Sequence, residues 1–235
     1  MLKVYLTFLL LLSSCATKYI VPGNRFITPE TNGGALKGQV EIQQTDANQV
    51  TIDASTGSLK GVNYNTVTRT GFMFSESFFD AFDLFWTHIG SANSLIGAKI
   101  QLMGGSKAAR AEGHKLAFAA AIGSNEHEPE DKSIEFKLTG RDLLVIYGYR
   151  FSEFLLPYIS LSSALYDFSG TIKKDPTLAG QKPHFETNIL SLSPGLEVDY
   201  GPVVAKLEAT YQQLETTDTK EKTNFIFGWS LGYSW

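Results

Sequence analysis

The chain has 235 residues, with 20 Lys and Arg against 24 Asp and Glu, which gives a formal net charge of −4 at pH 7. A nucleic-acid-binding protein needs a basic face that neutralises phosphates, so we expect no nucleic-acid partner. Cys15 is the single cysteine, which excludes a disulfide framework, a Cys-rich metal site and thiol catalysis in the body of the chain. No run approaches the ~18 apolar residues of a membrane-spanning helix.

The amino-terminal end predicts a secretory signal peptide over residues 1–15. A single lysine precedes an apolar run that is too short to span a bilayer as a helix. Residues 12–15, LSSC, resemble the lipobox of bacterial lipoproteins. The resemblance implies lipidation of Cys15 and, because Ala16 follows in place of aspartate, sorting to the outer membrane. The same letters also fit an ordinary signal-peptidase site, with Ser14 and Ala16 at positions minus three and minus one, whose cleavage would remove Cys15.

Residues 16–34 contain two prolines and three glycines and show no sustained hydrophobic period. Such a segment is typical of a linker, and we interpret it as a periplasmic tether. The alternative interpretation is a plug that closes the mouth of the domain that follows.

Residues 35–235 break into runs that alternate apolar and polar residues and are separated by polar turn clusters, which is the pattern of β-strands. A transmembrane barrel with both ends in the periplasm has an even number of strands, so we expect ten, although eight remain possible. A further hairpin around Val50 to Lys60 could decorate the outside. The ten expected strands are Leu36–Gln43, Tyr64–Glu76, Phe79–Gly90, Ser94–Gly104, Gly113–Ser124, Ser133–Arg150, Phe154–Gly170, Phe185–Tyr200, Pro202–Glu215 and Asn224–Trp235.

Gly201-Pro202 suits a two-residue hairpin turn, and that turn fixes a register. It places Glu197 opposite Lys206 and Gly195 opposite Glu208, so that opposite charges share one face and apolar residues the other. Reversing one charge of the Glu197–Lys206 pair should then destabilise the protein more than reversing both. In the run Ser133–Arg150 the apolar phase slips around Thr139, which predicts a β-bulge or a strand that leaves the membrane there.

A barrel of this size has room for side chains and little else. The charged residues expected inside carry both signs, and we interpret them as ion pairs that keep the lumen shut, with a narrow ion path as the alternative. The residues expected to face inward are Arg69, Asp83, Lys99, Lys137, Arg141, Glu197, Lys206 and Glu208.

The last run, Asn224–Trp235, alternates large apolar residues with Gly, Ser and Ile, and lipid is a suitable cover for its apolar face. Over residues 35–235 the chain resembles small bacterial outer-membrane barrels of the OmpA and OmpX type, on its strand number, its FFDAFDLFW hairpin entry and its terminal SLGYSW. The resemblance implies an all-β, transmembrane, antiparallel up-and-down barrel in the outer membrane of a Gram-negative bacterium. It also implies a monomer in contact with membrane lipid and lipopolysaccharide, and recognition of Trp235 and Tyr233 by the barrel-insertion machinery.

We expect a structural or surface-interaction role rather than an enzyme, with no cofactor, catalytic residue or metal ligand assigned. A small diffusion channel is the first alternative. A lipid-modifying enzyme is the second, with His184 and Glu186 beside Ser191 and Ser193 as the one cluster that suits it. A lipocalin-like lipid-binding lipoprotein is the rival fold. The acidic run 126–131 could bind a divalent cation but is expected to be a solvated loop.

Overall fold

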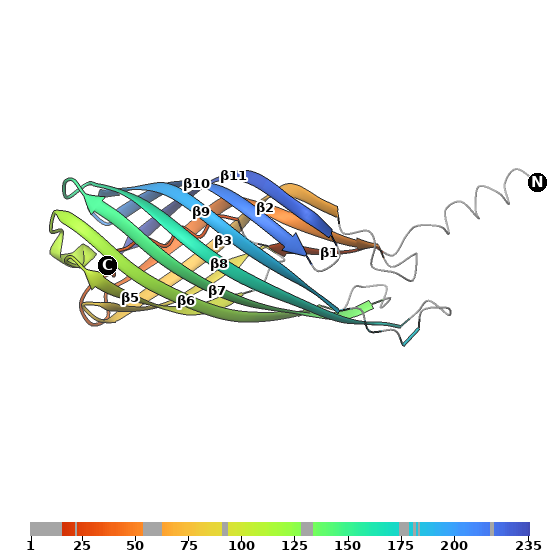
Figure 1. Ribbon diagram of the computed structural model, residues 1–235. Helices are drawn as coiled ribbons and strands as arrows, with labels where there is room; N and C mark the ends of the chain where they lie inside the picture. Colours follow the sequence, from red (N-terminus) through yellow and green to blue (C-terminus); the bar gives the residue numbers. More distant parts are fainter. Residues whose placement is uncertain are drawn as a thin grey trace, which may run out of the picture.

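The computed structural model describes residues 16–21, 23–53, 63–90, 94–127, 134–173, 179–180, 182, 184–216 and 219–235. Ten antiparallel strands close into a barrel, because the last strand pairs with the first of the ten and each of the others pairs with its neighbours in sequence (Figure 1). The expected count of ten is confirmed. The strands are β2 (Gly38–Asp53), β3 (Asn63–Phe79), β4 (Phe82–Ile89), β5 (Leu95–Met103), β6 (Gly113–His127), β7 (Ile134–Arg150), β8 (Leu155–Ile172), β9 (His184–Tyr200), β10 (Val203–Thr216) and β11 (Thr219–Ser234).

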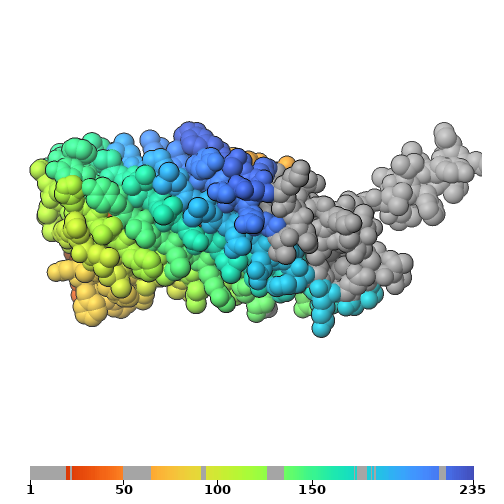
Figure 2. Space-filling view, in the orientation of Figure 1, coloured from red at the N-terminus to blue at the C-terminus, as the bar shows by residue number. Residues whose placement is uncertain are grey.

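The outer wall carries an apolar belt, because every strand turns one face outward and that face includes exposed apolar side chains. Figure 2 shows part of this wall, over which the later strands follow one another in sequence order. Apolar groups on the outside of a closed sheet have no protein layer to cover them, which is the condition of a barrel in lipid. One exposed member of the belt from each strand, β2 to β11, is given by Ile42, Phe72, Trp86, Ile100, Phe118, Val145, Ile159, Leu192, Leu207 and Phe227.

The alternate residues point into the lumen and are mostly polar beside the belt. The two faces thus follow the period of two that the sequence predicts. One buried polar residue from each strand, in the same order, is given by Glu41, Ser75, Asp83, Lys99, Lys115, Arg150, Ser160, Glu197, Lys206 and Ser230.

The two ends of the barrel differ. The end that holds Trp235 has short connections, including the two-residue turn Gly201-Pro202 and the 3-10 helix η1 (Lys107–Ala109), and we call it the Trp235 end. At the opposite end, the loop end, the strands end at unequal heights (Figure 1). β4 has 8 residues whereas β8 has 18, so the wall projects unevenly. Within the described residues, no helix is long and apolar enough to cross a membrane.

The register of β9 and β10 is confirmed: Glu197 lies opposite Lys206 and Gly195 opposite Glu208. The predicted bulge in β7 is wrong, because β7 pairs with β6 and β8 without a register shift. At the loop end the inward face of β7 is apolar, and Phe136 is buried there. Lys137 and Arg141, expected inside, are therefore exposed on the outer face. Lys137 lies beyond the belt, and Arg141 lies at its edge, opposite the exposed Ile122 of β6.

Residues 16–34 are not a tether. Strand β1 (Ala16–Val21) pairs antiparallel with the loop-end half of β2, and residues 23–33 are buried inside the barrel. The alternative interpretation, a plug, describes this segment. A chain with no hydrophobic period gives no sequence signal for burial, because its partners are polar side chains of distant strands. The described part of the 50–60 region prolongs β2 as far as Asp53, and residues 54–62 lie outside the described chain.

Candidate functional site

The candidate site is the filled lumen. We call residues 23–32 the luminal segment. Its backbone is bonded to side chains of the wall, beginning with the carboxylate of Glu208, which accepts hydrogen bonds from the backbone N–H of Arg25 at 2.8 Å and of Phe26 at 3.1 Å. Lys206 Nζ donates to the carbonyl of Phe26 at 2.8 Å, and the hydroxyl of Tyr158 donates to Glu208 at 3.0 Å. Buried backbone groups need such partners, and side chains of the wall supply them to the luminal segment.

The same pattern continues toward the Trp235 end. The N–H of Thr31 donates to Gln101 Oε1 at 2.8 Å, and that of Asn32 donates to both carboxylate oxygens of Asp83, at 3.2 and 3.1 Å. Lys99 Nζ lies 3.1 Å from Asp83. The η1 turn covers this point, since the N–H of Lys107 donates to the carbonyl of Thr31 at 2.8 Å. The luminal segment is therefore bonded to the wall at both of its ends.

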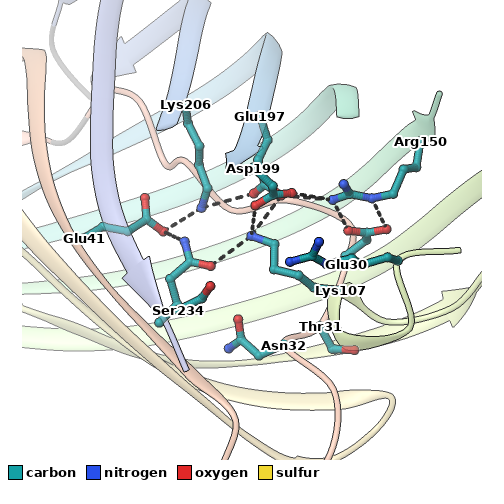
Figure 3. A network of polar contacts seen from close by, with 12 residues as sticks. Glu30, Thr31, Asn32, Glu41, Lys107, Arg150, Glu197, Asp199, Lys206 and Ser234 are labelled. Carbon is teal, nitrogen blue, oxygen red and sulfur yellow. Dashed lines mark hydrogen bonds and ion pairs between the residues drawn. The ribbon is translucent and has the colours of Figure 1, made fainter. Parts of the chain in front are cut away.

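Charged side chains gather where the luminal segment reaches the Trp235 end (Figure 3). Arg150 Nε donates to Glu30 of the luminal segment at 2.8 Å, and Lys115 Nζ lies 3.0 Å from the same carboxylate. Arg150 also contacts Asp199 at 2.9 Å and Glu197 at 3.2 Å. Two carboxylates of β9 and one of the luminal segment thus share a single guanidinium.

Lys107 of η1 joins this cluster from the turn, with Nζ at 2.9 Å from Glu197 and 3.2 Å from Asp199. Burial alone would lower the pKa of the Lys107 ammonium, but these carboxylates outweigh burial and raise the pKa above its usual value. Lys206 lies 2.6 Å from Glu41. The cluster therefore balances four carboxylates against four cations: Glu30, Glu41, Glu197 and Asp199 with Lys107, Lys115, Arg150 and Lys206.

The lumen changes character toward the loop end. Arg25 pairs with Asp142 of β7, and beyond that pair the interior is lined by aromatic rings. Phe168 stacks on Phe136 and on Phe185, with ring centroids 5.3 and 4.6 Å apart. This apolar layer lies beyond the belt. In that part of the barrel the apolar side chains are buried on the inner face of the wall instead of being exposed on its outer face. The lumen is thus filled by ions at one end and by rings at the other.

The residues predicted for the interior do not share one environment. Glu197, Lys206, Glu208, Lys99 and Asp83 are all buried in the lumen. Lys99 meets Asp83, whereas Glu208 binds backbone N–H groups rather than a cation of the facing strand.

Arg69 stands apart. It is half-buried on β3, and its Nε is buried without a hydrogen-bond partner.

Sequence reasoning missed several interior residues. Asp142 and Arg150 have the even numbers of the inward face of β7, so an unbroken alternation would have found them. Glu30 and Arg25 carry no such signal, because the luminal segment has no period. Lys107 lies in a turn that the alternation does not reach.

The lipid-hydrolase cluster does not form. His184 and Glu186 are exposed on the outer face, whereas Ser191 and Ser193 are 3% and 2% exposed inside the lumen. Residues of opposite parity on one strand point to opposite sides of the wall. His184 instead lies 3.4 Å from Asp167 on β8.

At the other predicted positions, Trp235 lies at the barrel seam, where its N–H donates to the carbonyl of Gly38 at 3.0 Å. Tyr233 is exposed in the belt. Cys15 and the side chains of the 126–131 run lie outside the described residues.

Fold and lumen together define the class: a ten-stranded antiparallel barrel with an apolar outer belt, whose interior is occupied by its own amino-terminal segment. No protein-family model matches the sequence, and neither does any curated protein.

Solved structures similar in fold include Ail, the attachment invasion locus protein of Yersinia pestis, at 12% identity and a TM-score of 0.41, over 86% of this chain and 100% of that one. Neisserial surface protein A is 14% identical with a TM-score of 0.38, over 84% and 95%. The outer membrane channel DcaP of Acinetobacter baumannii is 8% identical with a TM-score of 0.25, over 94% and 97%. Likeness at this level says nothing of function.

Proposed function

We propose that this chain is an outer-membrane barrel of a Gram-negative bacterium, with a structural or surface-interaction role and a lumen that does not conduct. One observation carries the proposal: the luminal segment fills the interior and is hydrogen-bonded to the wall, while the apolar belt faces outward. Among the residues that the structure describes, nothing in that interior is arranged to exchange a solute. A lipocalin-like barrel would instead need an apolar lumen free for a ligand and a polar exterior.

The outer face beyond the belt supports a role at the membrane surface. On β7 the last exposed apolar residue toward the loop end is Leu143, and Arg141 and Lys137 follow on the same face. Charges at that height meet the headgroup layer rather than hydrocarbon, where an outward lysine or arginine costs little. Basic side chains there suit the phosphates of lipopolysaccharide. We include lipopolysaccharide and the surrounding lipid among the proposed partners.

A diffusion channel remains the second candidate, because the lumen beside the belt is polar. The ion pairs argue against it: a permeating ion would have to displace Glu30 from Arg150 and Lys115, which would leave buried charges uncompensated. We therefore place the channel second.

The test is fractionation followed by bilayer recording on the full chain. The protein should be extracted from the outer-membrane fraction, migrate differently with and without heating, and give no ion-selective steps. A variant that lacks residues 17–32 is the matched comparison, because β2 to β11 pair among themselves without that segment. The folded variant should conduct. Steps from the full chain would favour the channel, and recovery from the soluble periplasmic fraction would overturn the proposal.

A further inference from the structure

The pairing of β1 fixes the direction in which the chain enters the barrel. In β1, Ala16 lies opposite Asp53 and Val21 opposite Asn48. Because β2 begins at Gly38, beside Trp235, and ends at Asp53, Ala16 is at the loop end. The luminal segment then descends to the η1 turn at the Trp235 end before β2 begins. The chain thus passes through the barrel once, along its whole height, before it forms the wall.

The wall has an opening for this passage. β11 pairs with β2 only between Gln39 and Thr45. From Asn48 onward β1 pairs with β2 in place of β11. The chain crosses at the point of exchange, where the N–H of Asn24 donates to Thr45 Oγ1 at 3.3 Å.

Gly23 occupies the narrowest point of that crossing. A Cβ added there would lie 1.9 Å from Ile226 Cδ1 and 2.4 Å from the carbonyl oxygen of Asp46. Contacts of that length are impossible, so only glycine fits between the two strands.

We propose that the chain enters its barrel from the cell surface, so that the amino-terminal end of β1 is displayed outside the cell and the luminal segment runs inward to the periplasmic mouth. The inference rests on the proposed outer-membrane location and on Trp235 at the periplasmic rim.

This direction decides between the two processing sites. Asp53 lies eleven residues beyond Ile42, the last exposed apolar residue among the side chains of β2 that the structure describes. At about 3.3 Å per residue and a tilt of about 40°, that places Ala16 about 28 Å beyond the belt. One residue adds at most about 3.6 Å of reach, so an acylated Cys15 would have no bilayer to enter. The geometry points to cleavage after Ala16, which removes Cys15 and leaves Thr17 first.

Thiol labelling in intact cells tests the direction. Thr17→Cys creates the single free thiol of the processed protein, because Cys15 is either removed or blocked by its lipid. The unsubstituted protein is the blank. Two exposed positions calibrate the sides: Lys182→Cys in a loop-end connection and Glu112→Cys in a connection at the Trp235 end. A membrane-impermeant maleimide should label Thr17→Cys and Lys182→Cys in intact cells, and Glu112→Cys only after lysis.

Each other result overturns something specific. If Thr17→Cys reacts only after lysis while Lys182→Cys reacts in intact cells, the entry direction is wrong and the proposed location stands. If Lys182→Cys also needs lysis, the location or its orientation is wrong, and the inference fails with it. Mass spectrometry of the unsubstituted protein should find an amino-terminal peptide that begins at Thr17. Acylated Cys15 on a protein whose position 17 is shielded in intact cells would establish the opposite topology.

Discussion

Lys206 and Glu197 face each other across β10 and β9, yet the ammonium of Lys206 is 2.6 Å from Glu41 and 3.8 Å from Glu197. Glu197 has closer partners of its own, Lys107 at 2.9 Å and Arg150 at 3.2 Å. The two residues are neighbours in register but belong to different pairs. For these two residues the lateral neighbour on the sheet is therefore not the main electrostatic partner, whereas Lys99 and Asp83, which also lie opposite each other, do pair at 3.1 Å.

Charge exchange between these two positions should fail to rescue. Glu197→Lys or Lys206→Glu alone breaks a buried pair, at a cost of about 3 to 5 kcal/mol. The double exchange places a carboxylate at position 206 against Glu41 and an ammonium at position 197 against Arg150. Urea unfolding in detergent should find the double variant no more stable than either single one. A double variant clearly more stable than both would show that the direct pair dominates, as the register alone predicts.

Glu30→Gln tests whether the luminal segment stabilises the barrel. The substitution leaves Arg150 and Lys115 buried with one carboxylate fewer, and we expect a loss of about 3 to 5 kcal/mol in the free energy of unfolding. Glu153→Gln is the matched control, because its pair with Arg110 spans 3.4 Å between half-exposed side chains. An exposed pair contributes about 1 kcal/mol or less. Equal losses of unfolding free energy in the two variants would mean that the charge of Glu30 does not hold the luminal segment in place.

The wall could be predicted from the sequence because alternation, turn chemistry and burial agree there. The Gly201-Pro202 turn set the β9–β10 register correctly, and the belt follows from parity alone. In β7 the apolar phase changes where the strand leaves the belt, which agrees with the second of the two predictions for this strand: Phe136 turns inward, while Leu143 faces outward. The luminal segment could not be predicted, because its contacts are between backbone and remote side chains. The two backbone N–H groups that Glu208 binds belong to a segment about 180 residues away in the chain.

Gly195 and Tyr158 form a second tight contact in the wall. They lie opposite each other in β9 and β8, and a Cβ at position 195 would be 2.3 Å from Tyr158 Cζ. Gly195→Ala must displace the ring and weaken its hydrogen bond to Glu208, so we expect a loss of about 1 to 3 kcal/mol in unfolding free energy. In a Tyr158→Ala background the same change should cost far less, because contacting residues are not additive. Additive losses would mean that strand conformation, rather than the ring, requires glycine here.

Trp235 and Trp229 offer a matched pair for the proposed insertion signal. They are 44% and 43% exposed, so alanine at either position removes a similar area from the belt. Trp229 donates its indole N–H to Gln44 at 2.8 Å within the wall. Trp235 follows β11, and its ring packs against Phe74 with centroids 5.9 Å apart.

If the insertion machinery recognises the terminal aromatic, Trp235→Ala should lower the yield of folded barrel in the outer membrane several-fold, and Trp229→Ala should leave it nearly unchanged. Refolding of both purified variants into detergent micelles separates recognition from stability. Equal yields there, with unequal yields in cells, place the effect in assembly. If both variants lose yield in cells and in micelles alike, Trp235 acts only as one aromatic residue of the belt, because exposure to lipid then explains both substitutions.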